Sequence, residues 1–251
     1  MLFTDLDGTV LDNEDYSYES SINSIRTLKE HDVPVVFCSS KTKCEQEIYR
    51  WLLRVFDPFI VEDGSAIYIP RGYFNKKFEF DRAWGPYQII LLGARYDDIR
   101  KTIDGVEEST GIRSFGSMSP GEISEITGLD REFANIAKDR EYSETILVED
   151  EDAKNISDIL HRSNLTMSRG GKFWIVRGQT DKGKAVKKLK SIYKNEFGDV
   201  MTIGVGDSFN DLPMLENVDR PFLIKNGNIN DEIIQDINII DRFEEIVDTC
   251  L

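Results

Sequence analysis

The hydrophobic positions in the first third of the chain follow two patterns, which are uninterrupted apolar runs and the spacing of one helix face. Residues 2–4 form a short apolar segment, and residues 33–38 form a longer uninterrupted one. Such runs are typical of strands that are buried on both faces, as in a parallel sheet. Between them, apolar residues recur at the spacing of one helix face, which predicts a helix over residues 18–31. The same patterns predict a helix over residues 42–55 and strands over residues 59–61 and 66–69.

The middle of the chain predicts a different order of elements. The pattern indicates strands at residues 87–92 and 144–148, helices at residues 96–109 and 150–162, and a hairpin of residues 165–168 and 173–176. A further helix is expected after Ser119, because Glu122 follows at the spacing of a capping box. Helices set between hairpin strands are typical of an α+β unit. We therefore predict an inserted domain over residues 84–178.

The end of the chain returns to alternating helices and strands. The pattern predicts a helix over residues 184–197, a strand over residues 200–205 and a helix over residues 207–215. Alternation at both ends of the chain favours an α/β fold with a Rossmann-like, open, mostly parallel sheet. This core would be built from residues 1–83 and 179–251.

Composition narrows the possible partners. The chain has 251 residues and a formal net charge of −15, from 31 Lys and Arg against 46 Asp and Glu. Because such a surface repels phosphate backbones and anionic lipids, we expect neither nucleic acid nor membrane as a partner. No signal peptide and no apolar span of about 18 residues is visible, which favours a cytoplasmic protein. The three cysteines and two histidines lack the spacing of a zinc site.

Three predicted strands end in polar residues. Asp5 and Asp7 follow the first strand, Ser39 and Ser40 follow the second, and Asp207 follows a strand near the end of the chain. Ligands of open parallel sheets bind beyond the carboxyl ends of the strands, so these groups should meet at one edge. Three carboxylates crowded together need a cation among them. Carboxylates next to a phosphate suit Mg²⁺, which is the cofactor that we predict.

The segment Gly178–Ala185 offers a second charged group. It resembles a nucleotide-binding P-loop, but Ala185 lacks the metal-binding hydroxyl and Asp181 places a negative charge where phosphates would sit. The better interpretation is that Lys182, at a helix N-terminus, is a fixed cation beside the carboxylates. Asn210 and Asp211 would orient Asp207 or this lysine. The alternatives from other classes are a P-loop ATP-binding protein and a non-catalytic Mg²⁺-binding regulator.

Taken in order, these residues resemble the four motifs of the haloacid dehalogenase superfamily of phosphatases. The motifs are Asp5-Leu6-Asp7-Gly8-Thr9, Ser39, Lys182, and Gly206-Asp207 with Asn210-Asp211. The resemblance implies the fold of that superfamily and a C2-type cap formed by the inserted domain. It also implies that Asp5 is the nucleophile, that Asp7 is the acid and base, that Ser39 and Lys182 stabilise the phosphoryl group, and that Asp5, Asp7 and Asp207 hold Mg²⁺.

Further segments resemble the members that act on mannosyl-3-phosphoglycerate. They include residues 38–42, residues 58–70, and Arg169-Gly170-Gly171. This similarity implies a small phosphorylated substrate of the sugar-phosphoglycerate class, bound by Ser40, Lys41 and the Arg-Gly-Gly turn, and a monomer or homodimer. Ser39 replaces the usual Thr but keeps the hydroxyl. Asp63 replaces the usual Asn, and Lys172 and Trp174-Ile175 replace the commoner residues after the glycine pair, so glucosyl-3-phosphoglycerate, phosphoglycolate and other sugar phosphates remain alternatives.

Overall fold

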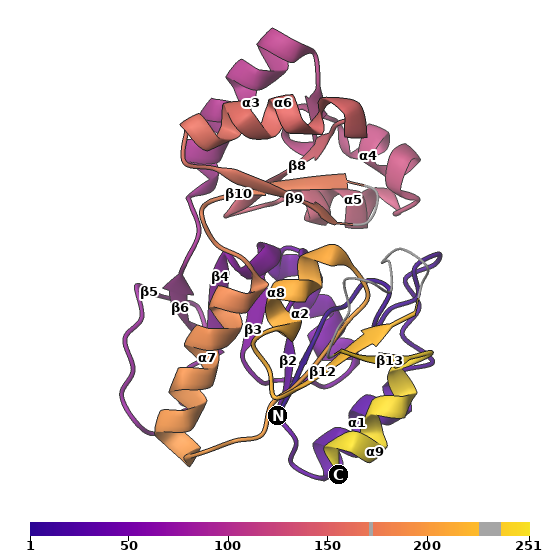
Figure 1. The fold of residues 1–251 in the computed structure, drawn as a ribbon, viewed down its shortest axis with the longest axis vertical. Helices are drawn as coiled ribbons and strands as arrows, with labels where there is room; N and C mark the ends of the chain where they lie inside the picture. Colours follow the sequence, from indigo (N-terminus) through magenta and orange to yellow (C-terminus); the bar gives the residue numbers. More distant parts are fainter. Residues whose placement is uncertain (171–172, 226–236) are drawn as a thin grey trace.

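The computed structural model describes residues 1–170, 173–225 and 237–251, and its central element is a five-stranded parallel sheet (Figure 1). The strand order is β13-β12-β11-β1-β2. The strands are β1 (Leu2–Thr4), β2 (Val35–Phe37), β11 (Ile203–Gly206), β12 (Arg220–Ile224) and β13 (Asn238–Ile240). All neighbours in this sheet are parallel. The predicted α/β core is therefore confirmed.

Both faces of this sheet are buried, which explains the uninterrupted apolar runs. Leu2 packs into a cluster with residues of one set of helices, and the next residue, Phe3, packs into a second cluster on the opposite face. Successive side chains of a strand point to opposite faces, so both must be apolar when helices cover both. The first set comprises α1 (Ile22–Glu30), α2 (Lys43–Leu52) and α9 (Val247–Cys250), and the second comprises α7 (Lys182–Phe197) and α8 (Leu212–Leu215).

A second sheet extends the core beside β2. It is antiparallel with the order β3-β4-β6-β5, and Cys38 at the end of β2 bridges to Ile60 in β3. Its strands are β3 (Phe59–Val61), β4 (Ala66–Pro70), β5 (Arg82–Trp84) and β6 (Tyr87–Leu91). The strand predicted at residues 87–92 thus pairs with β4, although we placed it in the inserted domain. Hydrophobic pattern reveals a strand but not its partner, so the sequence did not show that this strand pairs with β4.

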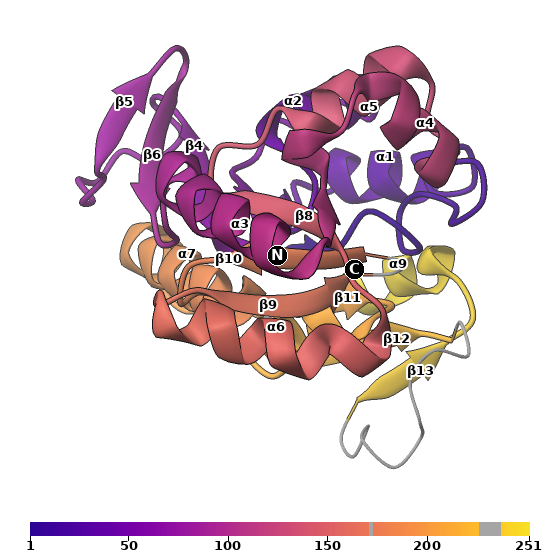
Figure 2. The same ribbon diagram turned by 90° about the horizontal axis from the view of Figure 1, so that it is seen from above.

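The inserted domain lies above the sheet edge as an antiparallel sheet covered by helices (Figures 1 and 2). The sheet order is β7-β8-β10-β9, with β7 (Arg113–Ser114), β8 (Ser143–Leu147), β9 (Thr166–Gly170) and β10 (Phe173–Arg177). The helices are α3 (Tyr96–Thr110), α4 (Pro120–Thr127), α5 (Arg131–Lys138) and α6 (Asp150–Arg162). Apolar residues of α3 and α6 pack on one face of this sheet. The opposite face is turned toward the core (Figure 1).

The chain passes between the core and the inserted domain twice, near Ala94 and near Gly178, and these two segments run side by side. A side chain at Gly178 would lie 2.4 Å from the backbone nitrogen of Ala94, so only glycine permits this approach. We propose that the cap comprises residues 94–177, between these crossings, and that the rest of the chain forms the core.

Three local predictions can be compared with the structure: two helix bounds differ and one capping box is confirmed. The first helix begins at Ile22 instead of residue 18, because Tyr18 accepts the backbone N–H of Ser21 in a turn. The segment 207–215 is a 3₁₀ turn, η3 (Phe209–Asp211), followed by α8. The capping box of Ser119 and Glu122 is present at the start of α4. Helix α5 was not predicted.

Candidate active site

The carboxyl ends of β1 and β11 bring acidic residues from the two ends of the chain together. The backbone N–H of Asp5 donates to the carbonyl of Val205 at 3.0 Å, since the two strands are parallel neighbours. Asp207 directly follows β11. Carboxylate oxygens of Asp5, Asp207 and Asp211 all lie within 4.8 Å of one another. These three residues therefore form an acidic cluster that could hold a metal ion.

A buried ammonium group lies against this acidic cluster. Lys182, the first residue of α7, places Nζ 2.8 Å from Asp5 Oδ1 and 2.6 Å from Asp211 Oδ1. Its side chain is only 1% exposed, so the carboxylates compensate its charge in place of water. Helix α7 begins here because Asp181 Oδ1 accepts the backbone N–H of Lys184 at 2.7 Å. The N-cap thus determines where the lysine enters the site.

The acidic cluster carries more negative than positive charge. Burial raises the pKa of Asp5 well above its usual range, and the neighbouring carboxylates raise it further against the opposing effect of Lys182. Burial alone would lower the pKa of Lys182, but Asp211 and Asp5 outweigh it and raise that pKa well above its usual range. A divalent cation would offset the excess negative charge and keep Asp5 ionised. The residues present therefore fit a bound metal ion.

Asp211 is held by protein groups on both of its oxygens. Oδ2 accepts the backbone N–H groups of Asp207 and Ser208, each at 3.0 Å, and Oδ1 accepts from Lys182. These bonds orient the lysine and fix the turn after β11. Asp211 is therefore occupied with the lysine and the turn, which makes it a poor donor for a metal ion. Carboxylate oxygens such as those of Asp5 and Asp207 are of the kind that Mg²⁺ prefers.

The loop after β1 makes room for Asp207. Gly8 has φ +72°, and a Cβ on it would lie 2.3 Å from Asp207 Oδ2 and 2.6 Å from Asn13 Nδ2. A side chain at this position would strain the backbone and push the carboxylate away. The glycine of the first motif is thus required by the geometry of the acidic cluster.

The side chain of Asp7 points to Lys41. Asp7 Oδ1 lies 3.0 Å from Lys41 Nζ, which is also 3.5 Å from Glu45 Oε1. Burial would lower the pKa of Lys41, but the two carboxylates outweigh it and raise the pKa above its usual range. The charge of Lys41, which we expected to bind substrate, is thus already shared by two carboxylates. Asp7 remains accessible, because its side chain is 33% exposed.

The end of β2 brings the serine pair to the same sheet edge. The backbone N–H of Cys38 donates to the carbonyl of Thr4 at 2.8 Å, so the loops after β2 and β1 are neighbours. Ser39 is fully buried, and its Oγ accepts the backbone N–H of Lys41 at 3.3 Å. Ser40 lines the cavity above Asp5.

Asn210 connects two loops of the core. Its Nδ2 donates to Asp63 Oδ1 at 3.0 Å, and Asp63 Oδ2 lies 3.7 Å from Arg177 Nη1. Asp63 has a positive φ of 57°, in the turn after β3. Asn210 thus ties the loop after β11 to the turn after β3, whereas sequence analysis assigns it to Asp207 or Lys182.

A cavity of about 840 Å³ lies between the core and the cap. Its core side includes Asp5, Asp7, Tyr16, Ser40, Lys41, Asp207 and Phe209, and its cap side includes Phe115, Ala137, Arg140, Thr145, Arg169, Phe173 and Ile175. This volume suits a small molecule with several polar groups. The cavity combines carboxylates and cations from the core with apolar and basic side chains from the cap.

Arg169, the first residue of the predicted Arg-Gly-Gly turn, lines this cavity. Arg169 pairs across the sheet with Trp174, whose side chain packs with α3 and α6, so Arg169 shares that face. There Nη1 of Arg169 contacts Asp150 at the start of α6. Gly170 ends β9, and Gly171 lies outside the described residues. The structure thus gives Arg169 a carboxylate partner on the cap itself.

Sequence analysis missed the residues that join core and cap. Glu62 has a positive φ of 49°, and its carboxylate accepts the backbone N–H groups of Glu141 and Tyr142 at 2.9 and 3.0 Å and the hydroxyl of Ser143 at 2.6 Å. Arg140 reaches back and donates to the carbonyl of Ser40 at 2.7 Å. The acidic turn between two apolar strands was a visible signal for Glu62. No pattern along the chain singles out Arg140.

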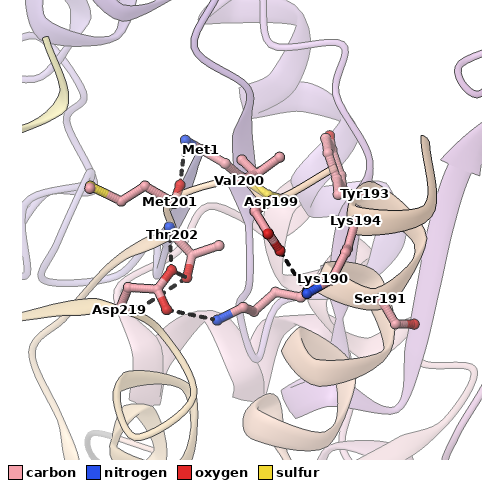
Figure 3. Close-up of a pocket in the computed structure, with 10 residues that line it drawn as sticks. All are labelled: Met1, Lys190, Ser191, Tyr193, Lys194, Asp199, Val200, Met201, Thr202 and Asp219. Atoms are coloured by element: carbon pink, nitrogen blue, oxygen red, sulfur yellow. Dashed lines mark hydrogen bonds and ion pairs between the residues drawn. The ribbon is translucent and has the colours of Figure 1, made fainter. Parts of the chain in front are cut away.

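A second pocket, of about 500 Å³, lies at the other end of the sheet (Figure 3). It surrounds Met1, whose amino group donates to the carbonyl of Met201, and Asp219, which lies 3.6 Å from Lys190. Met1 and Thr202 precede β1 and β11, so this pocket is at the amino ends of the strands. Ligands of such sheets bind at the carboxyl ends, where the acidic cluster lies.

Comparison with solved structures supports the same fold. A structure titled Thermoplasma acidophilum 0175 superposes with a TM-score of 0.70 at 20% sequence identity, over 99% of this chain and 94% of that one. Identity at this level shows the fold alone. The present chain therefore shares its fold with this solved structure.

Comparison with sequences gives the family. The chain is 42% identical over 229 residues to glucosyl-3-phosphoglycerate/mannosyl-3-phosphoglycerate phosphatase of Methanococcoides burtonii, covering 90% of this chain and 84% of that protein. It is 39% identical to mannosyl-3-phosphoglycerate phosphatase of Pyrococcus furiosus, over 96% of both chains. The family model for haloacid dehalogenase-like hydrolases matches residues 2–83 and 101–239. The chain belongs to the haloacid dehalogenase-like hydrolase family.

Proposed function

We propose that this protein is a Mg²⁺-dependent phosphatase that removes the phosphate of 2-O-hexosyl-3-phosphoglycerates, giving the hexosylglycerate. The observation that carries the proposal is the buried Lys182 bonded to both Asp5 and Asp211, beside Asp207 and beneath the cavity. An ammonium group and carboxylates in this arrangement suit a phosphoryl group that is attacked by a carboxylate. Relatives at about 40% identity carry the names of such phosphatases.

In the first step, an oxygen of Asp5 attacks phosphorus and the bond from phosphorus to the ester oxygen breaks. Asp7 gives its proton to the leaving alkoxide, which departs as the alcohol. In the second step, water attacks the aspartyl phosphate, Asp7 takes a proton from that water, and the Asp5 carboxylate is released with inorganic phosphate. The partial exposure of the Asp7 side chain leaves it within reach of both the leaving group and water.

The remaining residues hold the phosphoryl oxygens and the metal ion. Asp5, Asp207 and the backbone carbonyl of Asp7 would hold Mg²⁺, which when bound offsets the repulsion between carboxylates and phosphate. The ammonium of Lys182 and the hydroxyl of Ser39 would stabilise the transferring oxygens. Asp211 would keep the lysine oriented, as its bonds to the turn after β11 suggest.

We infer that both mannosyl and glucosyl forms are substrates, because two relatives, at 42% and 40% identity, are named for both sugars. The P-loop alternative is disfavoured, because Lys182 is bonded to two carboxylates and is not exposed to a nucleotide. No helix in the described part of the chain is long and apolar enough to cross a membrane. We propose a cytoplasmic monomer or homodimer that acts on this small phosphorylated substrate.

The test is phosphate release from a panel of compounds, with Mg²⁺ and then with a chelator. We expect release from mannosyl- and glucosyl-3-phosphoglycerate, loss with the chelator, and recovery when Mg²⁺ is restored. Faster release from phosphoglycolate or simple sugar phosphates would assign a different substrate. Hydrolysis of ATP alone would support the P-loop alternative, and no release from any compound would support a regulatory protein.

A further inference from the structure

Arg140 is a cation at the seam between cap and core. It lies between α5 and β8, and its side chain reaches the loop after β2. Its Nη2 donates to the carbonyl of Ser40 at 2.7 Å, and Ser40 follows the serine that we assign to the phosphoryl group. Arg140 lines the cavity and is only 8% exposed. A buried cation is thus bonded to the loop after β2 (residues 38–41), which carries Ser39 and which we call the phosphate-binding loop.

The guanidinium of Arg140 is fixed in place and still has donors to offer. Its Nε donates to Ser143 Oγ at 2.9 Å, and its Nη1 contacts the carbonyl of Ala137 at 3.5 Å. Together with the bond to Ser40, three of its five N–H groups are used among the described residues. The other two are available to a ligand in the cavity. A planar donor group held in this way suits a carboxylate.

The charge of Arg140 is less compensated than that of the other cavity cations. Glu62 is the nearest carboxylate, 3.7 Å from Nε, and its oxygens are held by Ser143 and two backbone N–H groups. Lys41, in contrast, lies within 3.5 Å of two carboxylates. Arg169 contacts Asp150 on the helix-covered face of the cap sheet. Among these cations, Arg140 is the one best placed to receive a further negative charge.

We propose that Arg140 binds the carboxylate of the glyceryl part of the substrate and so determines specificity for phosphoglycerate esters. This inference rests on the proposed function. In such a substrate the carboxylate and the phosphate are on the two ends of one three-carbon chain. A cation next to the phosphate-binding loop can therefore bind the carboxylate while the phosphate faces Asp5. Because Arg140 also contacts the core through Ser40, substrate would bind across the seam.

The test compares two substrates that differ only in the carboxylate. These are 2-O-mannosyl-3-phosphoglycerate and 2-O-mannosylglycerol 3-phosphate, in which a hydroxymethyl group replaces the carboxylate. We expect the wild-type protein to prefer the first by on the order of 10- to 100-fold in kcat/KM. Arg140→Gln should reduce this ratio to near one. A purely structural role would lower activity on both substrates equally and leave the ratio unchanged, which would overturn the proposal.

Three further variants make the test decisive. Arg140→Lys keeps the charge but loses the planar pair of donors, so the ratio should fall several-fold; an unchanged ratio would count against the proposal even if the Gln variant does not fold. The control is Arg113→Ala, which removes an exposed arginine of the cap that is bonded to Glu122 and does not line the cavity, and it should retain the wild-type ratio. Loss of the ratio in Arg169→Ala with retention in Arg140→Gln would assign the carboxylate to Arg169 and overturn the proposal. A wild-type protein that hydrolyses both substrates equally well would refute the role of Arg140 and leave the proposed phosphatase activity intact. Failure on both substrates would instead refute the proposed function.

Discussion

At the scale of single residues, the site is defined by charges that compensate one another away from water. Lys182 is bonded to Asp5 and Asp211, and Lys41 lies between Asp7 and Glu45. Each of these two buried lysines is therefore held by two carboxylates. Removing a single member leaves its partners buried without compensation, so individual substitutions should have distinct effects.

Asp5→Asn should abolish turnover and preserve the fold. The amide oxygen can still accept from Lys182, but the amide cannot attack phosphorus, so we expect kcat to fall on the order of 10³-fold or more. Phosphate release and thermal unfolding would be measured together. The control is Asp97→Asn, an exposed position in α3, which should leave both unchanged. Near-normal activity of Asp5→Asn would refute its role as nucleophile.

Gly8→Ala and Gly72→Ala separate backbone strain from damage to the site. Both glycines have a positive φ, of +72° and +79°, so each substitution should cost about 1–2 kcal/mol in the free energy of unfolding. Only the Cβ at residue 8 would meet Asp207, whereas nothing lies within 4 Å at residue 72. We therefore expect strongly reduced phosphatase activity for Gly8→Ala and wild-type activity for Gly72→Ala. Equal activities would show that Asp207 tolerates displacement.

At the scale of elements, the residues that begin two helices position the site and connect it to the cap. Thr42 is the N-cap of α2: its Oγ1 accepts the backbone N–H of Glu45 and donates to the carbonyl of Ile136 in α5, each at 3.2 Å. The same residue therefore ends the loop that carries Ser39 and contacts the cap. Asp181 plays the corresponding part for α7 and Lys182. Thr42 and Asp181 thus fix where α2 and α7 begin, and the charged residues Lys41 and Lys182 lie directly beside these two caps.

Thr42→Ala should affect both stability and substrate binding. Loss of the capping bond should cost about 1 kcal/mol, and loss of the contact to Ile136 should raise KM because core and cap are joined less firmly there. The matched control is Ser119→Ala, which removes a similar capping box at the start of α4. It should cost a similar free energy of unfolding without raising KM. If KM rises equally in both, general destabilisation explains the effect.

At the scale of the whole molecule, an acidic protein must bind an acidic substrate. The net charge of −15 gives a long-range field that repels anions, while Lys41, Arg140 and Lys182 attract them only at short range. Long-range interactions are screened beyond about 10 Å at 0.1 M salt, whereas buried pairs are screened much less. Binding of an anion therefore requires that the local cations, together with the proposed metal ion, overcome this long-range repulsion.

Raising the ionic strength at constant Mg²⁺ should increase kcat/KM. Screening weakens the repulsion during approach more than it weakens the buried contacts. The increase should be larger for mannosyl-3-phosphoglycerate than for p-nitrophenyl phosphate, which lacks the carboxylate charge. Rates measured between low and moderate salt would check this. A decrease with salt would mean that the local cations already dominate the approach of substrate.

The sequence by itself determined the parallel core and the residues that approach its edge. Buried strands require uninterrupted apolar runs, and polar residues directly after them must lie at the carboxyl ends, which is why Asp5, Ser39 and Asp207 could be predicted together. The capping box at Ser119 is equally local, since both partners lie within one helical turn. These features depend on neighbours along the chain.

The tertiary structure alone decided which distant side chains pair. It joined β6 to β4, turned Arg169 toward Asp150, and brought Arg140 to Ser40 across 100 residues of sequence. Such contacts depend on how separate elements pack. The period of the hydrophobic positions predicts that an element forms but not which other element it packs against. The chemistry of the edge follows from local pattern, whereas the seam that would select the substrate arises only when the cap folds against the core.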